Sequence, residues 1–293
     1  RLNINDLGYL IGQILNAGGR LGKSNYASQL LSSDNSNIIK IKSIELIELN
    51  NRRKEIETLI LDEIDFQKIE NESRDVIIYY SPNINEGLIG IIAARLKDYF
   101  NKPSIVITSS NKLLKGSARS LYNYNIGRAI KRSLDKEIIT SGGGHNMAAG
   151  FTLTKGNLKD FENFIIKDYL NAGSISDHIF LFDAEVSSYA FNIDFYSDIK
   201  KLEPFGTGNP TPTFLIKDLK VIKTTVLNDK HISLILKSKT GFSIKSISFN
   251  SLNSKVGEYL LNYKNKLNVL GQINENIWNN KKTLQLTIRD VII

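Results

Sequence analysis

The hydrophobic pattern of the chain changes character near residues 171–178, a polar stretch of small residues reading NAGSISDH. Before it, apolar runs typical of buried strands alternate with segments of helical periodicity. After it, the apolar segments mostly alternate at period two, which is typical of strands with one buried face. The change predicts an α/β layer with a partly parallel sheet, followed by an all-β unit.

The α/β layer is expected to occupy residues 73–172. Its strand patterns and helical patterns alternate, which favours parallel strands joined by crossing helices. The expected strands are 75–81, 103–109 and 115–120, the expected helices are 86–100, 125–137 and 157–170, and residues 139–153 are expected to form a glycine loop and a further strand.

Residues 1–72 are expected to lead into this layer. Residues 6–32 are punctuated by glycine and predict a loop that runs into a short helix. Residues 38–72 lack Pro and Gly and have apolar residues near helical spacing, which predicts a long connecting helix with Asn50–Asn51 as its weak point. Three acidic residues on this helix are interpreted as solvated surface rather than a metal site: Asp62, Glu63 and Asp65.

The all-β unit is expected to span residues 173–293. About five strands and one inserted helix fit a small barrel of the OB type. The strand patterns cover 179–186, 213–226, 230–238, 242–250, 265–278 and 283–293, and the helical pattern covers 254–263.

Composition excludes several classes of protein. Of the 293 residues, 41% are hydrophobic and 23% are charged, an ordinary balance for a folded chain. The absence of Cys excludes a disulfide framework, a thiolate metal site and a cysteine nucleophile, and three His are too few for a histidine metal cage. No apolar run approaches the roughly 18–20 residues of a membrane span and no charged-then-apolar leader opens the chain, so we expect a cytoplasmic protein.

The basic excess is confined to the last quarter of the chain. Residues 1–216 carry 25 basic and 25 acidic residues, whereas residues 217–293 carry 13 basic and 5 acidic residues. A concentrated basic lobe is typical of proteins that bind a polyanion, most often nucleic acid. The alternative is a solvated lysine-rich surface in a sequence crowded with Ile, Asn and Lys. Between Asp98 and Asp135 lie seven basic residues and no acidic one, which predicts a second phosphate-binding face.

The string SGGGH at 141–145 is the strongest local signal for chemistry. Successive glycines let backbone N–H groups approach an anion closely, so Gly143 and Gly144 are candidate phosphate binders. The neighbouring His145 can donate to a phosphate oxygen or move a proton. A flexible tight turn with a surface histidine is the alternative.

The string GSARS at 116–120 is the second signal. Ser117 and Arg119 are two residues apart, so on a strand they share one face. A hydroxyl beside a guanidinium suits a terminal phosphate, which Arg can bind through two hydrogen bonds. Ser120 completes the candidate set, and an edge strand with an exposed arginine is the alternative.

A third string, NAGGRLG at 16–22, places Arg20 in a glycine-flanked loop that can hold a backbone phosphate. A helix-entry turn is the alternative. The GKS at 22–24 is not part of a P-loop, because Ala17 stands where that motif requires its first glycine.

Five blocks, taken in order, resemble the bacterial RecJ family, the single-strand-specific 5′→3′ DNA exonucleases of the DHH phosphoesterase superfamily. The blocks are LNAGGRLG (15–22), EGLIGIIAARL (86–96), GSARS (116–120), GGGHNMAAGF (142–151) and LEPFGTGNPTPTF (202–214). The GGGH block alone fits any DHHA1-type domain. The last block and the basic barrel narrow the resemblance to RecJ.

The resemblance implies a three-part organisation. Residues 1–72 would be the end of a DHH domain and its connecting helix, residues 73–172 a DHHA1 domain, and residues 173–293 an OB domain that binds single-stranded DNA. The ligands for the family's Mn²⁺ or Mg²⁺ ions would lie before residue 1, so this chain alone is expected to be inactive. Residue 1 is Arg and the sole Met is Met147, which fits a start downstream of the initiator. A single-strand-binding protein and a RecQ-type helicase are the implied protein partners.

The resemblance also assigns roles. Ser117 and Arg119 would hold the 5′-terminal phosphate, and Arg20 with Asn16 would clamp a neighbouring phosphate. Gly143, Gly144 and His145 would contact the scissile region beside the metals, with His145 as the catalytic residue of this chain. Four aromatic residues are candidates either for base stacking or for the barrel core: Phe242, Phe249, Tyr259 and Trp278.

The sequence departs from the family in two places. Gly12-Gln13-Ile14 stands where the family has Gly-Pro-Arg, and Ile84-Asn85 stands where it has Trp-His near the active centre. These departures keep one alternative open: a non-catalytic module that binds single-stranded nucleic acid. A second alternative is another DHHA1 phosphodiesterase such as an oligoribonuclease or a tRNA-editing protein, because the GGGH block fits any DHHA1-type domain.

Overall fold

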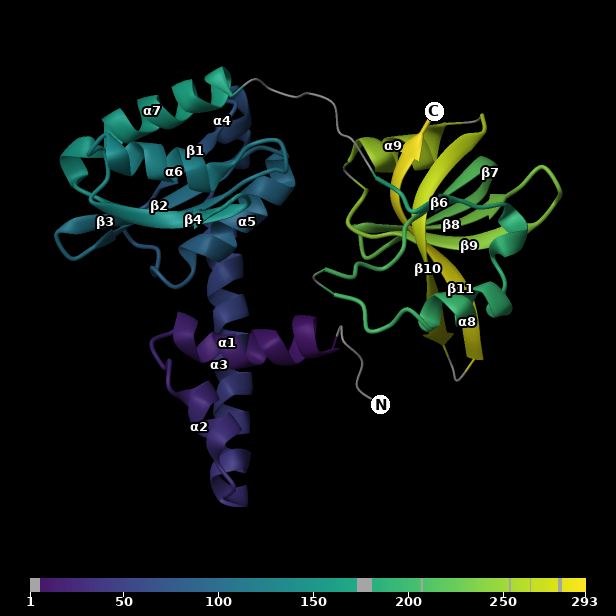
Figure 1. Cartoon of the computed structure of the whole chain (residues 1–293), viewed down its shortest axis with the longest axis horizontal. Coiled ribbons are helices and arrows are strands. Elements are labelled where there is room, and N and C mark those ends of the chain that lie inside the picture. The colour runs from purple at the N-terminus through teal and green to yellow at the C-terminus, as the bar shows by residue number, and fades with distance from the viewer. Residues whose placement is uncertain (1–5, 173–180, 207, 253, 264, 279–280) are drawn as a thin grey trace. The chain divides into compact units, whose positions relative to one another are not determined.

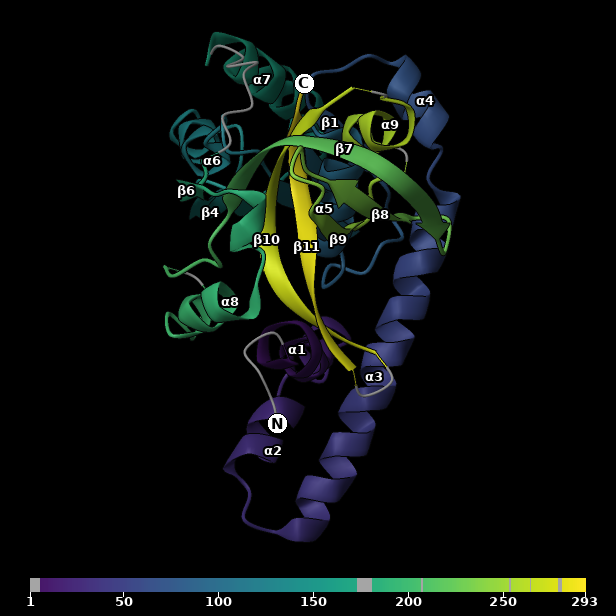
Figure 2. The same ribbon diagram turned by 90° about the vertical axis from the view of Figure 1, so that its right-hand side faces the viewer.

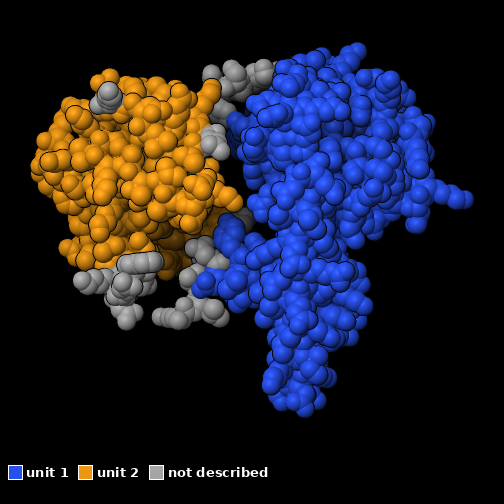
Figure 3. All heavy atoms as spheres, turned by 180° about the vertical axis from the view of Figure 1, so that it is seen from behind, with its two compact units in different colours: residues 1–177 blue, residues 178–293 orange. Residues whose placement is uncertain are grey.

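A computed structural model of the chain describes residues 6–172, 181–206, 208–252, 254–263, 265–278 and 281–293. The chain divides into two compact units, residues 1–177 and 178–293, which are coloured separately in Figure 3. The boundary expected at residues 172–173, within the NAGSISDH stretch, lies largely outside the described residues. Across the described residues, none of the helices combines the length and the apolar character needed to cross a membrane.

The first unit opens with helices. They are a π-helix (Asp6–Ile11), α1 (Gly12–Arg20), α2 (Tyr26–Ser32), α3 (Ser36–Glu63) and α4 (Phe66–Asn71). In Figures 1 and 2, α3 is a long rod with α1 and α2 beside it. The loop expected at the start of residues 6–32 is therefore wrong, since Gly18 and Gly19 are helical and Arg20 ends α1, whereas the short helix expected after it is present as α2.

The expected weak point of the long helix is also wrong. Helix α3 runs through Asn50 without interruption, because the Asn50 side chain bonds Arg53 one turn further along the same helix. The break falls instead after Glu63. There the Asp65 side chain accepts a hydrogen bond from the Lys68 N–H at 2.9 Å and starts a new helix.

A five-stranded sheet follows, in the order β1-β2-β3-β5-β4. Its strands are β1 (Ile77–Tyr80), β2 (Ser104–Ser110), β3 (Leu113–Arg119), β4 (Ser141–His145) and β5 (Ala148–Leu153), and its helices are α5 (Ile89–Phe100), α6 (Ile126–Asp135) and α7 (Leu158–Asn171). Strands β1 and β2 are parallel and the other pairs are antiparallel, which confirms the partly parallel sheet.

The two faces of this sheet are covered differently. Helices α6 and α7 lie on one face (Figure 1), where Ala118, Ala149 and Phe151 join a core with Phe161. Helix α5 lies on the other face and packs against Val106 of β2. Because α5 is a single helix, the part of this face formed by β5 and β4 is left exposed.

The glycine loop expected at SGGGH is an edge strand, β4, paired with β5 alone. Its glycines favour this by permitting close packing, since a Cβ at Gly142 would lie 2.8 Å from Ile139 and one at Gly144 would lie 2.3 Å from the Ala148 carbonyl oxygen. Gly127 of α6 similarly approaches the His145 carbonyl oxygen. Close contact with neighbours thus outweighs the weak strand preference of glycine.

The second unit is a closed five-stranded barrel (Figure 2), which confirms the OB-type prediction. Its elements are β6 (Ala184–Glu185), α8 (Ile193–Lys200), β7 (Phe214–Leu227), β8 (His231–Lys237), β9 (Ser243–Ser248), α9 (Lys255–Asn262), β10 (Leu267–Trp278) and β11 (Lys281–Ile292). Strand β10 pairs with both β11 and β7 and so closes the barrel. The strand expected over 179–186 is much shorter in the described part, and α8 was not predicted.

Candidate phosphate-binding site

Ser117 and Arg119 of β3 point to the same face of the sheet, as their spacing predicts. The Arg119 guanidinium turns back along the strand, and its Nη1 donates to the Ser117 Oγ at 3.1 Å and to the Ala118 carbonyl oxygen at 2.8 Å. The hydroxyl and the guanidinium are therefore held together, partly buried, on the α5 side of the sheet.

The start of α5 forms one wall of this site. A Cβ added at Gly90 would lie 2.9 Å from Arg119 Nη2 and 3.1 Å from Ser117 Oγ, so a larger residue here would displace the guanidinium that glycine leaves in place beside the helix. The first turn of a helix carries backbone N–H groups without intrahelical partners and the positive end of the helix dipole. Gly90 thus brings an anion-attracting helix end to the two side chains.

Arg20 approaches the same helix end from α1. Its Nη1 donates to the Gly87 carbonyl oxygen at 2.9 Å, and a Cβ at Gly87 would lie 2.2 Å from the Arg20 carbonyl oxygen. Arg20 and Arg119 therefore converge on the turn that contains Gly87 and Gly90. Asn16 is exposed one turn before Arg20 on α1, a spacing that puts both side chains on one side of the helix.

The site is rich in positive charge. Partial burial lowers the pKa of Arg119 below its ordinary value, and the nearby charge of Arg20 lowers it further. The pKa of Arg20 is also lowered, first by burial and then by Arg53, while Glu57 opposes this effect. Among the described residues neither Arg20 nor Arg119 forms an ion pair with a carboxylate. An anion between them would relieve their mutual repulsion.

Beyond Ser117 the exposed face of the sheet has a floor of small residues. Ser117 lies opposite Gly150 of β5, which lies opposite Gly143 of β4. A Cβ at Gly143 would meet no atom within 4 Å, and one at Gly150 would meet only the Gly116 carbonyl oxygen at 3.9 Å. Packing does not require glycine at these two positions. Because glycine has no side chain, both positions leave room above the sheet.

The next row of paired residues is Arg119, Ala148 and His145. His145 is exposed at the end of the edge strand, and its Nδ1 accepts a long hydrogen bond from the Met147 N–H at 3.4 Å. In the neutral ring this contact assigns the proton to Nε2, which can donate to a phosphate oxygen. The structure thus places His145 on the same face as the candidate phosphate ligands.

Ser120 is not brought together with these residues. Its side chain is buried, and its hydroxyl donates to the Tyr124 carbonyl oxygen at 2.7 Å. Because Ser120 follows Arg119 directly, it sits at the turn into α6 and stabilises that turn.

The Ile84-Asn85 pair lies in the segment before α5. Ile84 is buried in the core against α5, and its carbonyl oxygen accepts a hydrogen bond from the Thr108 hydroxyl at 2.7 Å. Asn85 is exposed, and its Oδ1 accepts from the Gly87 N–H at 2.8 Å. Asn85 therefore fixes the turn on which Arg20 rests.

The described residues contain no group of three or more His, Asp or Glu side chains that could hold a metal ion. They therefore do not fit a Mn²⁺ or Mg²⁺ centre. The acidic residues Asp62, Glu63 and Asp65 are exposed, as expected for a solvated surface.

Sequence reasoning missed three glycines of this site. The sequence does not distinguish Gly87 and Gly90 from glycines that only allow close helix packing, because the residues that they contact, on α1 and β3, are distant in the chain. Gly150 had a usable signal. It lies in the strand after GGGH, two residues from Ala148, so strand periodicity puts both residues on one face.

The second unit carries a lysine-rich surface on the outer side of β7, β8 and β9, formed by Lys220, Lys223, Lys237 and Lys245. Lys220 lies directly opposite Lys237, and Lys245 lies opposite Ile235, which itself lies opposite Lys223. Residues 220–227, 231–237 and 243–248 of these strands contain no Asp or Glu. The lysine surface is therefore a positive face suited to a phosphate backbone, and Asp218, earlier in β7, pairs with Lys239 beside it.

Of the aromatic candidates, Phe249 is the one with an exposed ring, 55% accessible, and it meets His231 edge to face at the end of the lysine surface. Phe242 and Tyr259 pack against the barrel core. The Trp278 side chain lies outside the described residues. Phe249 alone of the described candidates is placed to stack on a base.

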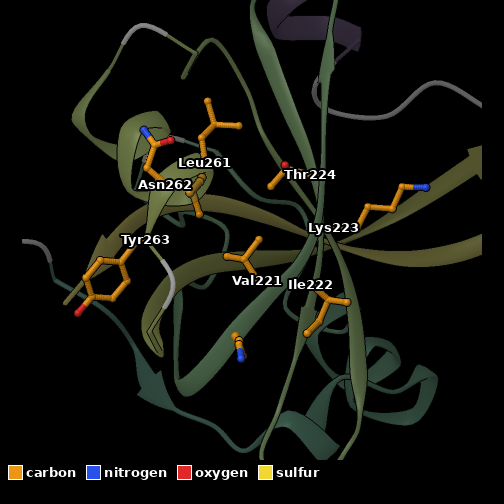
Figure 4. A pocket seen from close by; sticks show the side chains of 9 residues that line it. Val221, Ile222, Lys223, Thr224, Leu261, Asn262 and Tyr263 are labelled. Carbon is orange, nitrogen blue, oxygen red and sulfur yellow. The ribbon is translucent and has the colours of Figure 1, made fainter.

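A cavity of about 460 Å³ lies between β7 and α9. In Figure 4, Val221 and Thr224 lie on the side of β7 that faces Leu261 and Asn262 of α9, whereas the Lys223 side chain points away from α9. Lys220 and Lys223 are also among the residues that line the cavity, so the cavity adjoins the lysine surface.

Comparison with known proteins agrees with this architecture. Residues 73–170 match the family model described as the DHHA1 domain, and residues 182–290 match the RecJ OB domain. The chain thus contains a DHHA1 domain followed by an OB domain of the RecJ type.

The single-stranded-DNA-specific exonuclease RecJ of Haemophilus influenzae is 30% identical over 97% of the chain, and that of Bacillus subtilis is 26% identical over 99%. The chain spans 51% and 37% of the lengths of these two relatives. The crystal structure of Thermus thermophilus RecJ in complex with Mn²⁺ covers 99% of the chain with a TM-score of 0.79 at 23% identity, and 42% of that structure is matched. The chain belongs to the RecJ family, and the resemblance drawn from its sequence blocks is confirmed.

Proposed function

We propose that this chain is the substrate-holding part of a RecJ-family exonuclease that degrades single-stranded DNA from the 5′ end. The observation that carries the proposal is the convergence of Arg20, Arg119 and Ser117 on the first turn of α5. A 5′-terminal phosphate fits this site better than an internal phosphate does. It carries more negative charge and more free oxygens, and the site offers two guanidiniums, a hydroxyl and a helix N-terminus.

The glycine floor supports a path for the strand. Gly150 and Gly143 leave space above the sheet between Ser117 and the edge strand, so a sugar-phosphate backbone can lie close to it. The path leads toward His145, which is exposed at the end of β4. In this proposal the terminal phosphate rests on Ser117 and Arg119, and a following phosphate lies within reach of His145.

Phosphodiester cleavage in this proposal is done by metal ions bound to residues outside these 293. Three observations support it. The first two are that the described residues lack a metal-binding group and that the relatives are about twice as long as the chain or longer. A third is the apolar stripe on α3 formed by Ile38, Ile41, Ile44 and Ile47. Each of these residues is between 42% and 55% exposed, and together they form a row that winds along α3 and leaves apolar surface for another domain to cover.

Single-stranded DNA is the proposed partner of the second unit as well. The lysine surface would follow the backbone, and Phe249 would stack on a base. The single-strand-binding protein and the helicase that the family resemblance implies remain predictions.

Binding to matched single strands tests the proposal. The 293-residue chain is titrated with linear strands bearing a 5′ phosphate or a 5′ hydroxyl and with a circular strand of the same composition. We expect tightest binding to the phosphorylated strand, and Arg119→Ala should lose roughly 10- to 100-fold in affinity for that strand alone. Equal binding of wild type and Arg119→Ala to the phosphorylated strand would sink the proposal.

A nuclease time course in Mn²⁺ tests where the cleavage chemistry lies. We expect no degradation of any strand by this chain. Degradation of the linear strand would mean that the metal site is formed by these 293 residues.

The second candidate function is a module that binds single strands and takes no part in cleavage. The Ile84-Asn85 pair favours it, because an amide, that of Asn85, bonds the turn that supports Arg20 at the position where the family has its histidine. This candidate predicts equal affinity for circular and linear strands. Cleavage by a longer protein that contains this chain would eliminate it.

A further inference from the structure

A buried carboxylate on α3 ties together the elements around the phosphate-binding site. Glu57 and Arg53 each have a side chain only 8% exposed. Glu57 Oε2 accepts a hydrogen bond from Arg53 Nη1 at 2.6 Å, and Oε1 accepts one from Arg95 Nε of α5 at 2.7 Å. Each oxygen of one carboxylate therefore bonds a different helix, which fixes α5 against α3.

The Arg53 guanidinium is held on both sides. Asn50 Oδ1 accepts from its Nε at 3.3 Å and from its Nη2 at 3.2 Å, while Glu57 takes Nη1. The residues at 50, 53 and 57 follow one side of α3 at spacings of three and four. Arg53 thus has little freedom to move toward a ligand or toward a neighbouring arginine.

This cluster adjoins Arg20. Helix α1 packs closely on α3, where a Cβ at Gly18 would lie 3.3 Å from Leu46, one turn before Asn50. Arg20 follows two residues after Gly18, and the charges of Arg53 and Glu57 both act on its guanidinium, in opposite directions. Arg20 is therefore within electrostatic reach of both the buried cluster and Arg119.

We propose that Glu57 is a positioning residue for the phosphate clamp, acting through Arg20 and the start of α5; this assignment rests on the proposed function. Arg20 and Arg119 repel one another, and the charge of Arg53 also repels Arg20. Glu57 fixes the Arg53 side chain through a hydrogen bond and attracts the charge of Arg20. Its hydrogen bond with Arg95 also fixes α5, the helix that contains Gly90. A buried carboxylate is costly in desolvation, so a network in which each oxygen is bonded serves to fix geometry.

A positioning role for Glu57 and a role in charge balance alone predict opposite effects of neutralising Glu57 on 5′-phosphate binding. If Glu57 only tempers the local charge, its neutralisation makes the site more positive and tightens phosphate binding. If Glu57 positions Arg20, its neutralisation releases the clamp and weakens the preference for a 5′ phosphate. The sign of the change therefore separates the two roles.

The experiment compares Glu57→Gln with Glu55→Gln in the 293-residue chain. Glu55 is an exposed residue on the same helix, so its variant makes the same change in net charge outside the cluster. The readout is the ratio of dissociation constants for 5′-hydroxyl and 5′-phosphate strands, which partial unfolding does not alter. We expect this ratio to fall about tenfold in Glu57→Gln and to stay unchanged in Glu55→Gln. An unchanged or larger ratio in Glu57→Gln overturns the proposal.

Arg95→Gln provides a second variant if Glu57→Gln fails to fold. The Arg95 side chain is 57% exposed, and its loss leaves the buried pair of Arg53 and Glu57 intact. We expect a several-fold fall in the same ratio, and a ratio equal to that of wild type overturns the proposal. A wild-type chain with no 5′-phosphate preference defeats the clamp itself. A preserved wild-type preference with unchanged variants defeats only the role of Glu57.

Discussion

Ser117 on β3 and Gly143 on β4 lie in one row across the sheet, joined through Gly150 of β5. Side chains that are paired in this way project from the same face. The candidate phosphate ligand and the first open glycine of the edge strand therefore border the same space, although 26 positions separate them in the chain. The neighbouring Gly144 faces the other way, toward β5 and the core.

The adjacent glycines Gly143 and Gly144 should respond in opposite ways to substitution. Gly143→Val should leave the free energy of unfolding nearly unchanged, because no atom lies within 4 Å of its Cβ position, but should weaken single-strand binding at least about tenfold by filling the space above the floor. Gly144→Ala should lower the free energy of unfolding by about 1–3 kcal/mol, because its Cβ would meet the Ala148 backbone. Urea unfolding and strand titration measure the two effects. Normal binding by a folded Gly143→Val chain would contradict the proposed path.

The two serines of GSARS should also respond differently to substitution. Ser117→Ala should reduce affinity for a 5′-phosphorylated strand by roughly 10-fold and leave stability little changed, because its hydroxyl faces the site beside Arg119. Ser120→Ala should leave binding unchanged and cost about 0.5–1.5 kcal/mol of stability, because its buried hydroxyl bonds the Tyr124 carbonyl oxygen. The same two measurements on both variants are the check, and a binding defect confined to Ser120→Ala would reverse the assignment.

Local pattern was enough to predict which strand residues share a face. Ser117 and Arg119 needed only the period of a strand, and the barrel needed only its alternating segments. The convergence of Arg20 and Arg119 on the start of α5 could not be predicted from the sequence. Arg20 and Gly87 are 67 positions apart, and nothing local in either segment indicates that the other packs against it.

The wrong predictions have a common physical origin in tertiary contact. Glycines favour turns in isolation, but Gly142 and Gly144 sit in a strand because neighbouring atoms approach closer than a Cβ allows. Glu57 lies in a helix full of charges, and helical spacing alone does not say which charge is buried. Its burial depends on Arg95, which belongs to a different helix.

Tyr124 should make the first unit sensitive to alkaline pH. Burial raises the pKa of its hydroxyl well above the ordinary value, and the charge of Asp168, which accepts its hydrogen bond at 2.9 Å, raises it further. The unfolded chain loses this proton near pH 10 while the folded chain keeps it. The stabilisation is therefore complete below about pH 10 and is lost as pH rises toward the folded pKa, at up to about 1.4 kcal/mol per pH unit.

Tyr124→Phe is the matched variant for this pH dependence. It should cost about 1–3 kcal/mol at neutral pH, because the hydrogen bond to a charged group is lost. Its stability should then fall less steeply than that of wild type above about pH 10. Urea unfolding from neutral pH to about pH 11 gives both curves, and parallel curves would show that Tyr124 does not titrate as described.

Repulsion among the lysines of the lysine surface should lower the free energy of unfolding when no polyanion is bound. Lys220 and Lys237 lie directly opposite one another, and like charges in that position destabilise a sheet. Lys237→Gln should therefore raise the free energy of unfolding by about 0.2–1 kcal/mol while weakening single-strand binding. If Lys237 contacts one phosphate, the slope of log affinity against log salt should become shallower by about 0.7. Lys201→Gln is the control, because Lys201 pairs with Asp198 just after α8, away from these strands, and should leave the slope unchanged. Equal slopes for wild type and both variants would remove the lysine surface from the binding path.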